Sequence, residues 1–304
     1  MLRHPRKNAR ALRFKPPEKF ETLEVAKKRR QKCIAHLMAL TNNEKAQVPA
    51  TKLLSCRKSA RCRSGACPVC MRLYRLRWIK ECCKLLAQLG DVYRVSMILD
   101  HASLEPDSLH LLDLPKFLEA QQTAINRALP DDLKVIIIGG IDISLNTLEN
   151  GDAHWCPHLY LLIASASGQG LSKDVLDDSL KPMARRSSAS RPYMSTLVKQ
   201  HGLGKPPCPG LIPLPLSPEE VLAKVVSYAL KAAFVHRSGY GYIRRLSNEQ
   251  SHNTRPQSLR GPSLTEALLF MGQHGPGKRV LLRGVRRFGR PERFVLRLGR
   301  RLKA

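Results

Sequence analysis

Two runs of apolar, largely β-branched residues are separated by a short polar turn: KVIIIGGIDISLN at 134–146, LENGD at 148–152 and HLYLLIAS at 158–165. Both runs are typical of buried β-strands. A parallel pair of strands needs a crossover of a dozen or more residues, so a connection this short is compatible only with a hairpin. We therefore expect the two strands to be antiparallel neighbours in one sheet.

Further elements are expected on both sides of this hairpin. VYRVSMILD at 92–100 is predicted to be a strand, and LPKFLEAQQTAINRAL at 114–129 an amphipathic helix. One more helix is expected to begin after Ser172 as its N-cap, and another at 217–234, where Ser-Pro-Glu-Glu is a helix start signal. This order of elements predicts an α+β fold, a central antiparallel sheet with helices on one face.

The composition along the chain suggests four regions. They are a basic, partly helical N-terminal arm at 1–50, a Cys- and Arg-rich segment with a helix at 51–90, the sheet domain at 91–240 and a basic C-terminal region at 241–304. The Pro- and Gly-rich stretch at 202–218 is expected to be a loop.

The charge balance points to a polyanionic partner. The 304 residues carry 52 Lys and Arg against 24 Asp and Glu, a formal net charge of +28. Self-repulsion of this size favours a nucleic-acid ligand. No apolar run reaches the roughly 20 residues that span a bilayer, so we expect no membrane partner. The basic N-terminus has no apolar signal core, so a cytoplasmic protein is expected; an organelle transit peptide is the alternative.

Four of the nine cysteines lie close together in CRKSARCRSGACPVC at 56–70. Cys56, Cys62, Cys67 and Cys70 supply four sulfur ligands, the number that Zn²⁺ takes in a tetrahedral site, and the last two form a C-x-x-C pair. A zinc-knuckle-like site is predicted here. The alternative is a set of free thiols on a basic surface.

Basic and aromatic side chains continue directly after these cysteines. Arginines interleaved with aromatic rings suit the phosphates and bases of a single nucleic-acid strand. The candidates for DNA contact in this segment are Arg72, Arg75, Arg77 and Trp78.

A row of polar residues leads into the second strand of the hairpin, in HWCPHLYLLI at 154–163. His158 and Tyr160 are two residues apart in a strand, so their side chains are expected on the same face. Two such positions can hold one divalent ion, although a neutral phenol is a poor ligand. The alternative is a strand with a polar edge.

Tyrosine and lysine recur at helical spacing in VVSYALKAA at 225–233. Tyr228 and Lys231 are three apart, and Lys224 precedes the tyrosine by about one turn, so both cations are expected beside the phenol. Nearby ammonium groups favour the phenolate form, which is the nucleophile. The alternative is a tyrosine that packs on the sheet between two solvated lysines.

Taken together, these motifs resemble the rolling-circle replication initiators and related transposases of the HUH endonuclease superfamily. The order agrees: CPVC followed by arginines and tryptophan at 67–78, then strand, helix and strand, then WCPHLY at 155–160, and last the Y-x-x-K pair at 228–231. The resemblance covers about residues 55–240 and implies an HUH, ferredoxin-like fold.

The resemblance implies roles for individual residues. His158 would be a ligand of Mg²⁺ or Mn²⁺, Asp142 on the neighbouring strand a third polar ligand, Tyr228 the nucleophile and Lys231 a positioning or charge-neutralising group. The tyrosine would attack a phosphate of single-stranded DNA, leaving a 5′-phosphotyrosine and a free 3′-hydroxyl. Host replication proteins and a bacterial cytoplasm are further implications.

One position departs from the family pattern, because Tyr160 stands where the second histidine is expected. Three alternatives follow. The phenol contacts the metal through water, His154 replaces the missing ligand, or the site is inactive.

Three functions therefore remain open. The first is a DNA-nicking and joining enzyme that acts at a replication origin or at the end of a mobile element, with plasmid or phage replication as the context. The second is an inactive relative that only binds DNA as a regulator. The third is a basic zinc-containing RNA-binding protein. The arginine-rich tail, with Arg286 and Arg287 as candidate contacts, fits each of them.

Overall fold

The structure is a computed structural model that describes residues 16–17, 20–147, 151–166, 171–184, 192–198, 218–243, 250–291 and 293–299. Of the turn predicted at 148–152, residues 148–150 lie outside the described residues. The loop predicted at 202–218 also lies outside them except for Pro218, and so does the predicted N-cap Ser217.

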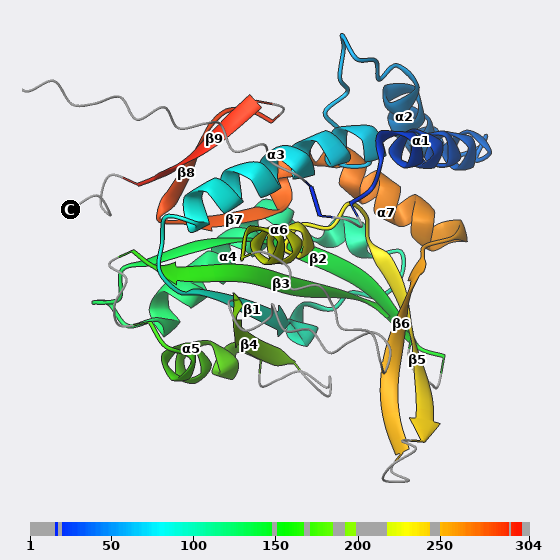
Figure 1. Cartoon of the computed structure of the whole chain (residues 1–304). Coiled ribbons are helices and arrows are strands. Elements are labelled where there is room, and N and C mark those ends of the chain that lie inside the picture. The colour runs from blue at the N-terminus through cyan, green and yellow to red at the C-terminus, as the bar shows by residue number, and fades with distance from the viewer. Residues whose placement is uncertain are drawn as a thin grey trace, which may run out of the picture.

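One curled, seven-stranded sheet organises the chain (Figure 1). Six strands follow the order β4-β1-β3-β2-β5-β6, and β7 also pairs with β2. The strands are β1 (Val92–Ile98), β2 (Val135–Thr147), β3 (Ala153–Ser165), β4 (Tyr193–Leu197), β5 (Val235–Ile243), β6 (Gln250–Ser258) and β7 (Val280–Arg283).

The predicted hairpin of β2 and β3 forms the middle of this sheet, and the two strands are antiparallel as expected. The sheet as a whole is mixed, because β5 lies parallel to β2 while the other pairs are antiparallel. β6 and β7, from the C-terminal part of the chain, are members of the same sheet.

Seven α-helices lie in the described residues: α1 (Leu23–Met38), α2 (Glu44–Leu54), α3 (Pro68–Leu86), α4 (Leu114–Ala128), α5 (Lys173–Leu180), α6 (Pro218–Tyr228) and α7 (Gly261–Gln273). The Ser172 hydroxyl accepts a hydrogen bond from the Val175 amide, so the predicted N-cap of α5 is confirmed. None of the described helices combines the length and the apolar character that crossing a bilayer requires.

The prediction that helices cover one face of the sheet is wrong, because both faces are covered. One face, which includes Ile137 and Leu161, packs against α4 and α5. The opposite face, which includes Ile138 and Leu162, packs against α3 and α6 (Figure 1). The unbroken apolar runs of β2 and β3 were the available signal, since a strand with one wet face alternates apolar and polar residues.

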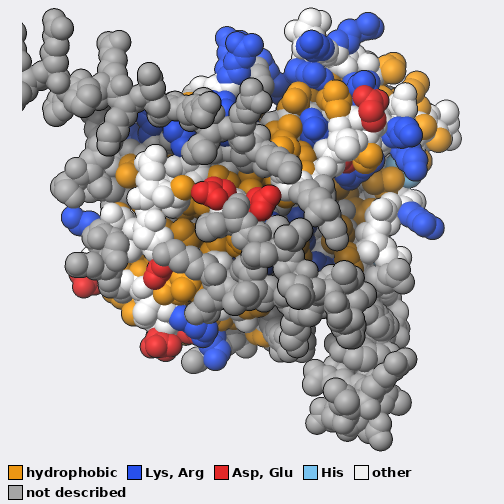
Figure 2. Space-filling view, in the orientation of Figure 1, with side chains coloured by type: hydrophobic (Ala, Val, Ile, Leu, Met, Phe, Trp, Pro, Cys, Tyr) orange, Lys and Arg blue, Asp and Glu red, His pale blue; other side chains and the backbone are white. Residues whose placement is uncertain are grey.

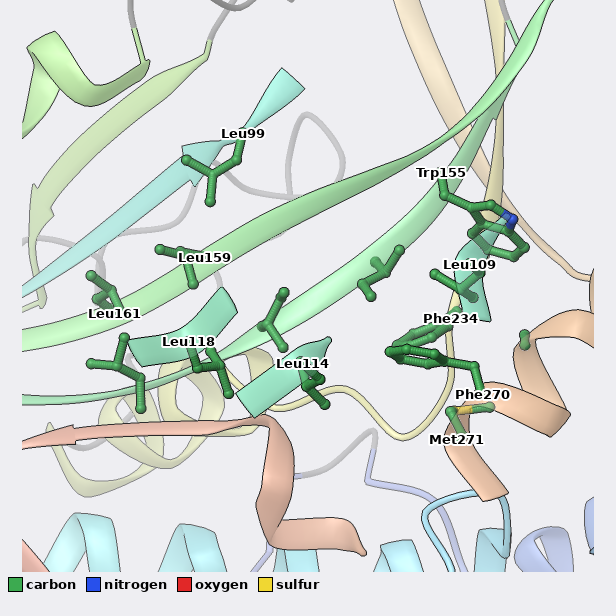
Figure 3. Packing of buried hydrophobic residues seen from close by; sticks show 14 of the residues in the cluster. Leu99, Leu109, Leu114, Leu118, Trp155, Leu159, Leu161, Phe234, Phe270 and Met271 are labelled. Carbon is green, nitrogen blue, oxygen red and sulfur yellow. The ribbon is translucent and has the colours of Figure 1, made fainter. Parts of the chain in front are cut away.

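The larger core lies between the sheet and the α4 side, and it extends to α7. Leu159 and Leu161 of β3, and Leu99 just after β1, face Leu114 and Leu118 of α4 (Figure 3). At the far end of the same core, the aromatic rings of Trp155, Phe234 and Phe270 are neighbours. Burial of these side chains, each stabilising by about 1.5–3 kcal/mol, holds β2 and β3 in place.

A two-stranded ribbon, β8 (Val285–Arg290) and β9 (Arg293–Leu298), packs against α3. Phe294 is buried and its ring lies 5.1 Å from that of Tyr74 on α3. The outer side of the ribbon is basic and exposed, with Phe288 among the arginines.

Candidate functional site

The four predicted cysteine ligands come together in one cluster. The Sγ atoms of Cys56 and Cys70 are 3.6 Å apart, those of Cys62 and Cys70 3.6 Å, and those of Cys56 and Cys67 3.8 Å. All four sulfurs lie within 4.8 Å of one another. Four thiolates at 2.3 Å from a tetrahedral zinc would stand about 3.8 Å apart. The cluster therefore could hold a metal ion such as zinc.

Local structure explains how the cluster forms. Cys56 comes just after α2, Cys67 is the N-cap of α3, and Cys70 lies in the first turn of that helix, behind Pro68. Between them, the Gly65 amide donates to the carbonyl of His274 at the end of α7. A Cβ at position 65 would lie 2.7 Å from that oxygen, so only glycine allows the approach.

The four thiols interact with one another. Hydrogen bonds from Cys67 and Cys70 lower the pKa of the Cys62 thiol to about 2. The pKa of Cys67 is raised to about 12, mainly because its proton is shared with Cys62. The eight cysteines that the structure describes are free thiols.

The arginines and the tryptophan that follow the cysteines have partners inside the protein. Arg72 Nε donates to the carbonyl of Glu21, and Arg77 Nε donates to that of Phe294. Trp78 is completely buried. The prediction that the Trp78 ring contacts DNA bases is therefore wrong, because helical periodicity directs this ring into the core between α3 and the sheet.

The second group of predicted residues lies on the sheet face covered by α3 and α6. β3 continues without a break through Pro157, so its alternate side chains from His154 to Tyr160 share a face. Across the strand pair, Asp142 of β2 lies opposite His158. Under α6 this face is apolar, but beyond the helix it becomes polar, with Asp142, Ser144 and His158 buried in it.

His158 is a neutral imidazole in this surrounding. Burial lowers its pKa to about 4, although Asp142 opposes the shift. Its Nε2 lies 3.0 Å from the hydroxyl of Ser144, which itself donates to Oδ1 of Asn146 at 2.8 Å. Because the single hydroxyl proton is used on Asn146, Nε2 of His158 must be the donor, which leaves its Nδ1 with a free lone pair.

Tyr228, the predicted nucleophile, lies on this face beside Tyr160. The two rings are 5.2 Å apart and perpendicular, and the Tyr160 ring is in turn 6.3 Å from that of His158. Tyr228 is 47% exposed, whereas Tyr160 is buried. Burial raises the pKa of Tyr160, so it remains a neutral phenol at neutral pH.

The Lys231 ammonium group lies between the two tyrosine rings and the Asp142 carboxylate and contacts all three. Its Nζ lies 2.5 Å from Oδ2 of Asp142, 5.0 Å from the centre of the Tyr160 ring and 4.8 Å from that of Tyr228. Burial lowers the pKa of Lys231, but the Asp142 carboxylate and the two tyrosines outweigh this effect and raise it. The lysine is therefore charged, and the site combines a phenol, an ammonium and a carboxylate.

The helix that carries Tyr228 is shorter than predicted. α6 ends at Tyr228, so Lys231 is not on a helix, and the expectation that both share one helical face is wrong. The buried Arg279 and the partly buried Arg75 hold the segment after the helix. Arg75 donates to the carbonyls of Ser227 and Leu230, and Arg279 donates to that of Lys231. These positively charged donors fit the carbonyl end of a helix.

A cleft of about 750 Å³ opens beside Lys231. Its floor is apolar and includes Phe234 and Leu264. The cations that line it are Arg29, Lys32, Arg75, Lys231 and Arg260. Figure 2 shows Lys and Arg side chains gathered at the top right of the molecule, over α1 and α2 of Figure 1. The cleft is thus lined by positive charge, and it is linked to Tyr228 through Lys231, whose Nζ lies 4.8 Å from the centre of the Tyr228 ring.

The remaining predicted residues are not part of this arrangement. Lys224 and Arg286 are exposed, and Arg287 donates to the hydroxyl of Tyr74. His154 lies near the start of β3, where Asp100 and Cys156 are its neighbours. Sequence analysis missed Arg279 and the structural role of Arg75, because a buried arginine that binds a distant carbonyl has no local pattern.

Comparisons with protein-family models, with curated proteins and with solved structures returned no match to this chain.

Proposed function

We propose that this protein cuts and rejoins single-stranded DNA through Tyr228, in the manner of a rolling-circle replication initiator of the HUH type. The observation that supports this most directly is the exposed Tyr228 ring beside the buried Tyr160 and the Lys231–Asp142 ion pair. An exposed phenol next to a fixed cation, on the same sheet face as a buried neutral imidazole, is a combination suited to attack on a phosphodiester.

In the proposed step, the Tyr228 hydroxyl loses its proton to water and its oxygen attacks the phosphorus of a backbone phosphate. The new O–P bond forms as the P–O3′ bond breaks, so the 3′-oxygen leaves with the electron pair and takes up a proton. The phosphate stays on the tyrosine as a 5′-phosphotyrosine. Lys231 would stabilise negative charge on the phosphate oxygens, and reversal by another 3′-hydroxyl would join strands.

A divalent ion would find ligands beside this tyrosine. Oδ1 of Asp142 is buried and has no hydrogen-bond partner among the described residues, and Nδ1 of His158 keeps its lone pair. These two groups fit Mg²⁺ or Mn²⁺, which would polarise the phosphate when bound. The neutral Tyr160 is not a good third ligand, so the ion would depend on water or on the DNA itself.

The substrate path that we propose follows the basic cleft to Tyr228. Arg29, Lys32 and Arg260 would contact phosphates, and the ribbon β8–β9 would add arginines and the exposed Phe288 on which a base can stack. The cysteine cluster would bind Zn²⁺ as a structural ion that fixes the start of α3, the helix whose Arg75 holds the Tyr228 segment.

A covalent-adduct assay tests the proposal. Single-stranded DNA labelled at its 3′ end is incubated with the full chain and Mn²⁺ or Mg²⁺, and the products are separated under denaturing conditions. We expect labelled protein, and we expect Tyr228→Phe to abolish it. Tyr193→Phe is the matched control, since this partly buried phenol on β4 donates to the Leu176 carbonyl away from the site.

Two results would contradict the proposal. One is an adduct that survives Tyr228→Phe, because the nucleophile would then be a different residue. The other is a native chain that binds DNA but forms no adduct with either ion over a panel of origin-derived oligonucleotides.

A second candidate function is DNA binding without cleavage. The observation that favours it is Tyr160, a buried neutral phenol where the resemblance expects a histidine, together with the occupation of Asp142 by Lys231. Restoring the ligand in Tyr160→His separates the two functions: a large gain in adduct favours an inactive relative, and a loss favours an active site that uses Tyr160. Competition with RNA of equal length tests whether the preferred ligand is DNA.

A further inference from the structure

Three side chains with different ligand atoms converge at the end of the polar sheet face. Asp100 lies in the short 3₁₀ helix that follows β1 (Asp100–Ala102), and His154 and Cys156 are at alternate positions of β3. One ligand atom from each lies within 4.8 Å of the other two. None of these residues belongs to the cysteine cluster at the start of α3.

The backbone makes this convergence a property of the sheet. His154 and Cys156 share the face that also carries His158, because β3 is continuous. β1 pairs with β3 as far as Ile98, which lies opposite His158, and the Leu99 amide then donates to the carbonyl of Pro157. Asp100 is therefore held next to Cys156, and its Oδ1 accepts a hydrogen bond from the thiol at 3.2 Å.

The spacing agrees with coordination of one ion. In a tetrahedral site with a metal–sulfur distance of 2.3 Å and a metal–oxygen distance of about 2.1 Å, the sulfur and oxygen stand roughly 3.5 Å apart. The proton between Cys156 and Asp100 occupies the place that a cation would take. Cys156 is buried, while Asp100 and His154 are partly exposed, so an ion could enter from their side.

We propose that Asp100, His154 and Cys156 form a second metal site, which takes a zinc-class ion and leaves its fourth position open. The ligand set decides the class: one thiolate and one imidazole favour Zn²⁺ or Co²⁺, whereas Mg²⁺ prefers oxygen ligands and is poorly matched to a thiolate. Three protein ligands with an open position are the pattern of zinc sites that bind an exchangeable water or substrate group. The site is independent of the nicking activity proposed above.

Metal content of the full chain tests this proposal. The reduced protein is equilibrated with buffered Zn²⁺ without oxygen, and bound zinc is measured by atomic emission. We expect His154→Ala and Cys156→Ser each to bind one zinc per chain fewer than the native protein. His101→Ala, which removes an exposed imidazole next to Asp100, is the matched control and should keep the native content.

A second measurement separates the two metal sites and guards against misfolding. Co²⁺ bound to four thiolates absorbs strongly in the sulfur charge-transfer region, so this signal should persist in His154→Ala while the weaker contribution of the one-thiolate site disappears. The proposal is overturned if the two variants and the native chain bind the same amount of zinc. It is equally overturned if the lost zinc in His154→Ala is accompanied by loss of the four-thiolate spectrum.

Discussion

The cysteine cluster and the polar sheet face are built in different ways. The cluster takes its four ligands from one stretch of chain, 56–70, whose ends are the end of α2 and the first turn of α3. The polar face takes its groups from β2, β3 and the segment after α6, with Asp142 and Lys231 in contact although they are 89 residues apart. One site is local and the other depends on the whole fold.

This difference has an energetic consequence. An ion in the cluster would tie the end of α2 to the first turn of α3 through side chains that are themselves part of the larger core, so part of its binding energy would be folding energy. The polar face is supported by the sheet and by two arginines, the buried Arg279 and the partly buried Arg75, so its geometry should not depend on an ion. The cluster should therefore respond to metal removal as a folding unit, and the polar face should respond mainly in affinity and rate.

The largest effect is expected in Cys62→Ser, which removes one of the four candidate zinc ligands. Structural zinc sites contribute on the order of 10 kcal/mol at neutral pH, so losing one of four ligands should lower the melting temperature by roughly 10 °C or more. A chelator should do the same to the native chain. Differential scanning calorimetry with and without added Zn²⁺ measures both.

The matched control for this change is Cys83→Ser. Cys83 is a partly buried thiol on α3 outside the cluster, so its replacement should lower the melting temperature far less and should leave the chelator effect intact. If Cys62→Ser and Cys83→Ser melt alike, and the chelator changes neither, the cluster does not stabilise the protein through an ion.

The next largest effect is expected at the Lys231–Asp142 pair. Breaking a buried ion pair from one side costs about 3–5 kcal/mol because a charge is left without a partner. Lys231→Met and Asp142→Asn should each be destabilising, and the double variant should be less so than their sum. Urea unfolding of all four proteins gives the coupling energy.

The matched control pair is Lys27 and Glu24, an exposed ion pair one turn apart on α1. Its coupling should be about 0.5 kcal/mol or less, since solvent screens exposed pairs. Equal coupling energies at the two pairs would mean that burial adds nothing at Lys231, and the charged cluster beside Tyr228 would lose its physical basis.

The sequence predicted the cluster better than it predicted the polar face, for a physical reason. Four cysteines within 15 residues are held close together by the short chain between them. The position of Asp142 opposite His158 instead follows from the register of a hairpin, and the sequence pattern alone does not place the turn of that hairpin to the residue. The strand and helix types of β1, β2, β3 and α4 followed from periodicity. The coverage of both sheet faces by helices was not predicted, although continuous apolar strands are typical of a sheet with two buried faces.

Within the candidate site, the pairing of tyrosine and lysine was predicted from helical spacing, yet the helix ends at Tyr228. The lysine still reaches the tyrosine because Arg75 and Arg279 hold the carbonyls of the segment that follows. Both arginines are far from this segment in sequence. Such contacts depend on tertiary packing, which local propensity does not encode.

A smaller effect, on rate, is expected at Arg75. In Arg75→Met the carbonyls of Ser227 and Leu230 lose a charged donor, a change worth about 1.5–3 kcal/mol. If part of this loss reaches the positioning of Tyr228, adduct formation should slow by roughly 10-fold or more. Single-turnover rates at saturating DNA measure the effect separately from affinity.

Arg72→Met is the matched control on the same helix, because Arg72 donates to the carbonyl of Glu21 instead. Its adduct rate should stay near the native value. A rate in Arg75→Met that equals the rate in Arg72→Met would show that the end of α6 does not need its arginine. The preorganisation of Tyr228 would then have to come from its edge-to-face contact with Tyr160 and from Lys231.

The smallest effect is expected on the ribbon β8–β9, where Arg286 and Arg290 are exposed on either side of Phe288. If both arginines contact phosphates, replacing them by glutamine should reduce the slope of log affinity against log salt by about 0.7 each for a single strand. Arg127→Gln is the control, since this exposed arginine lies on α4, against the opposite face of the sheet. Because the slope counts released counterions, an unchanged slope in the double variant would place the DNA path in the cleft beside Lys231 and away from the ribbon.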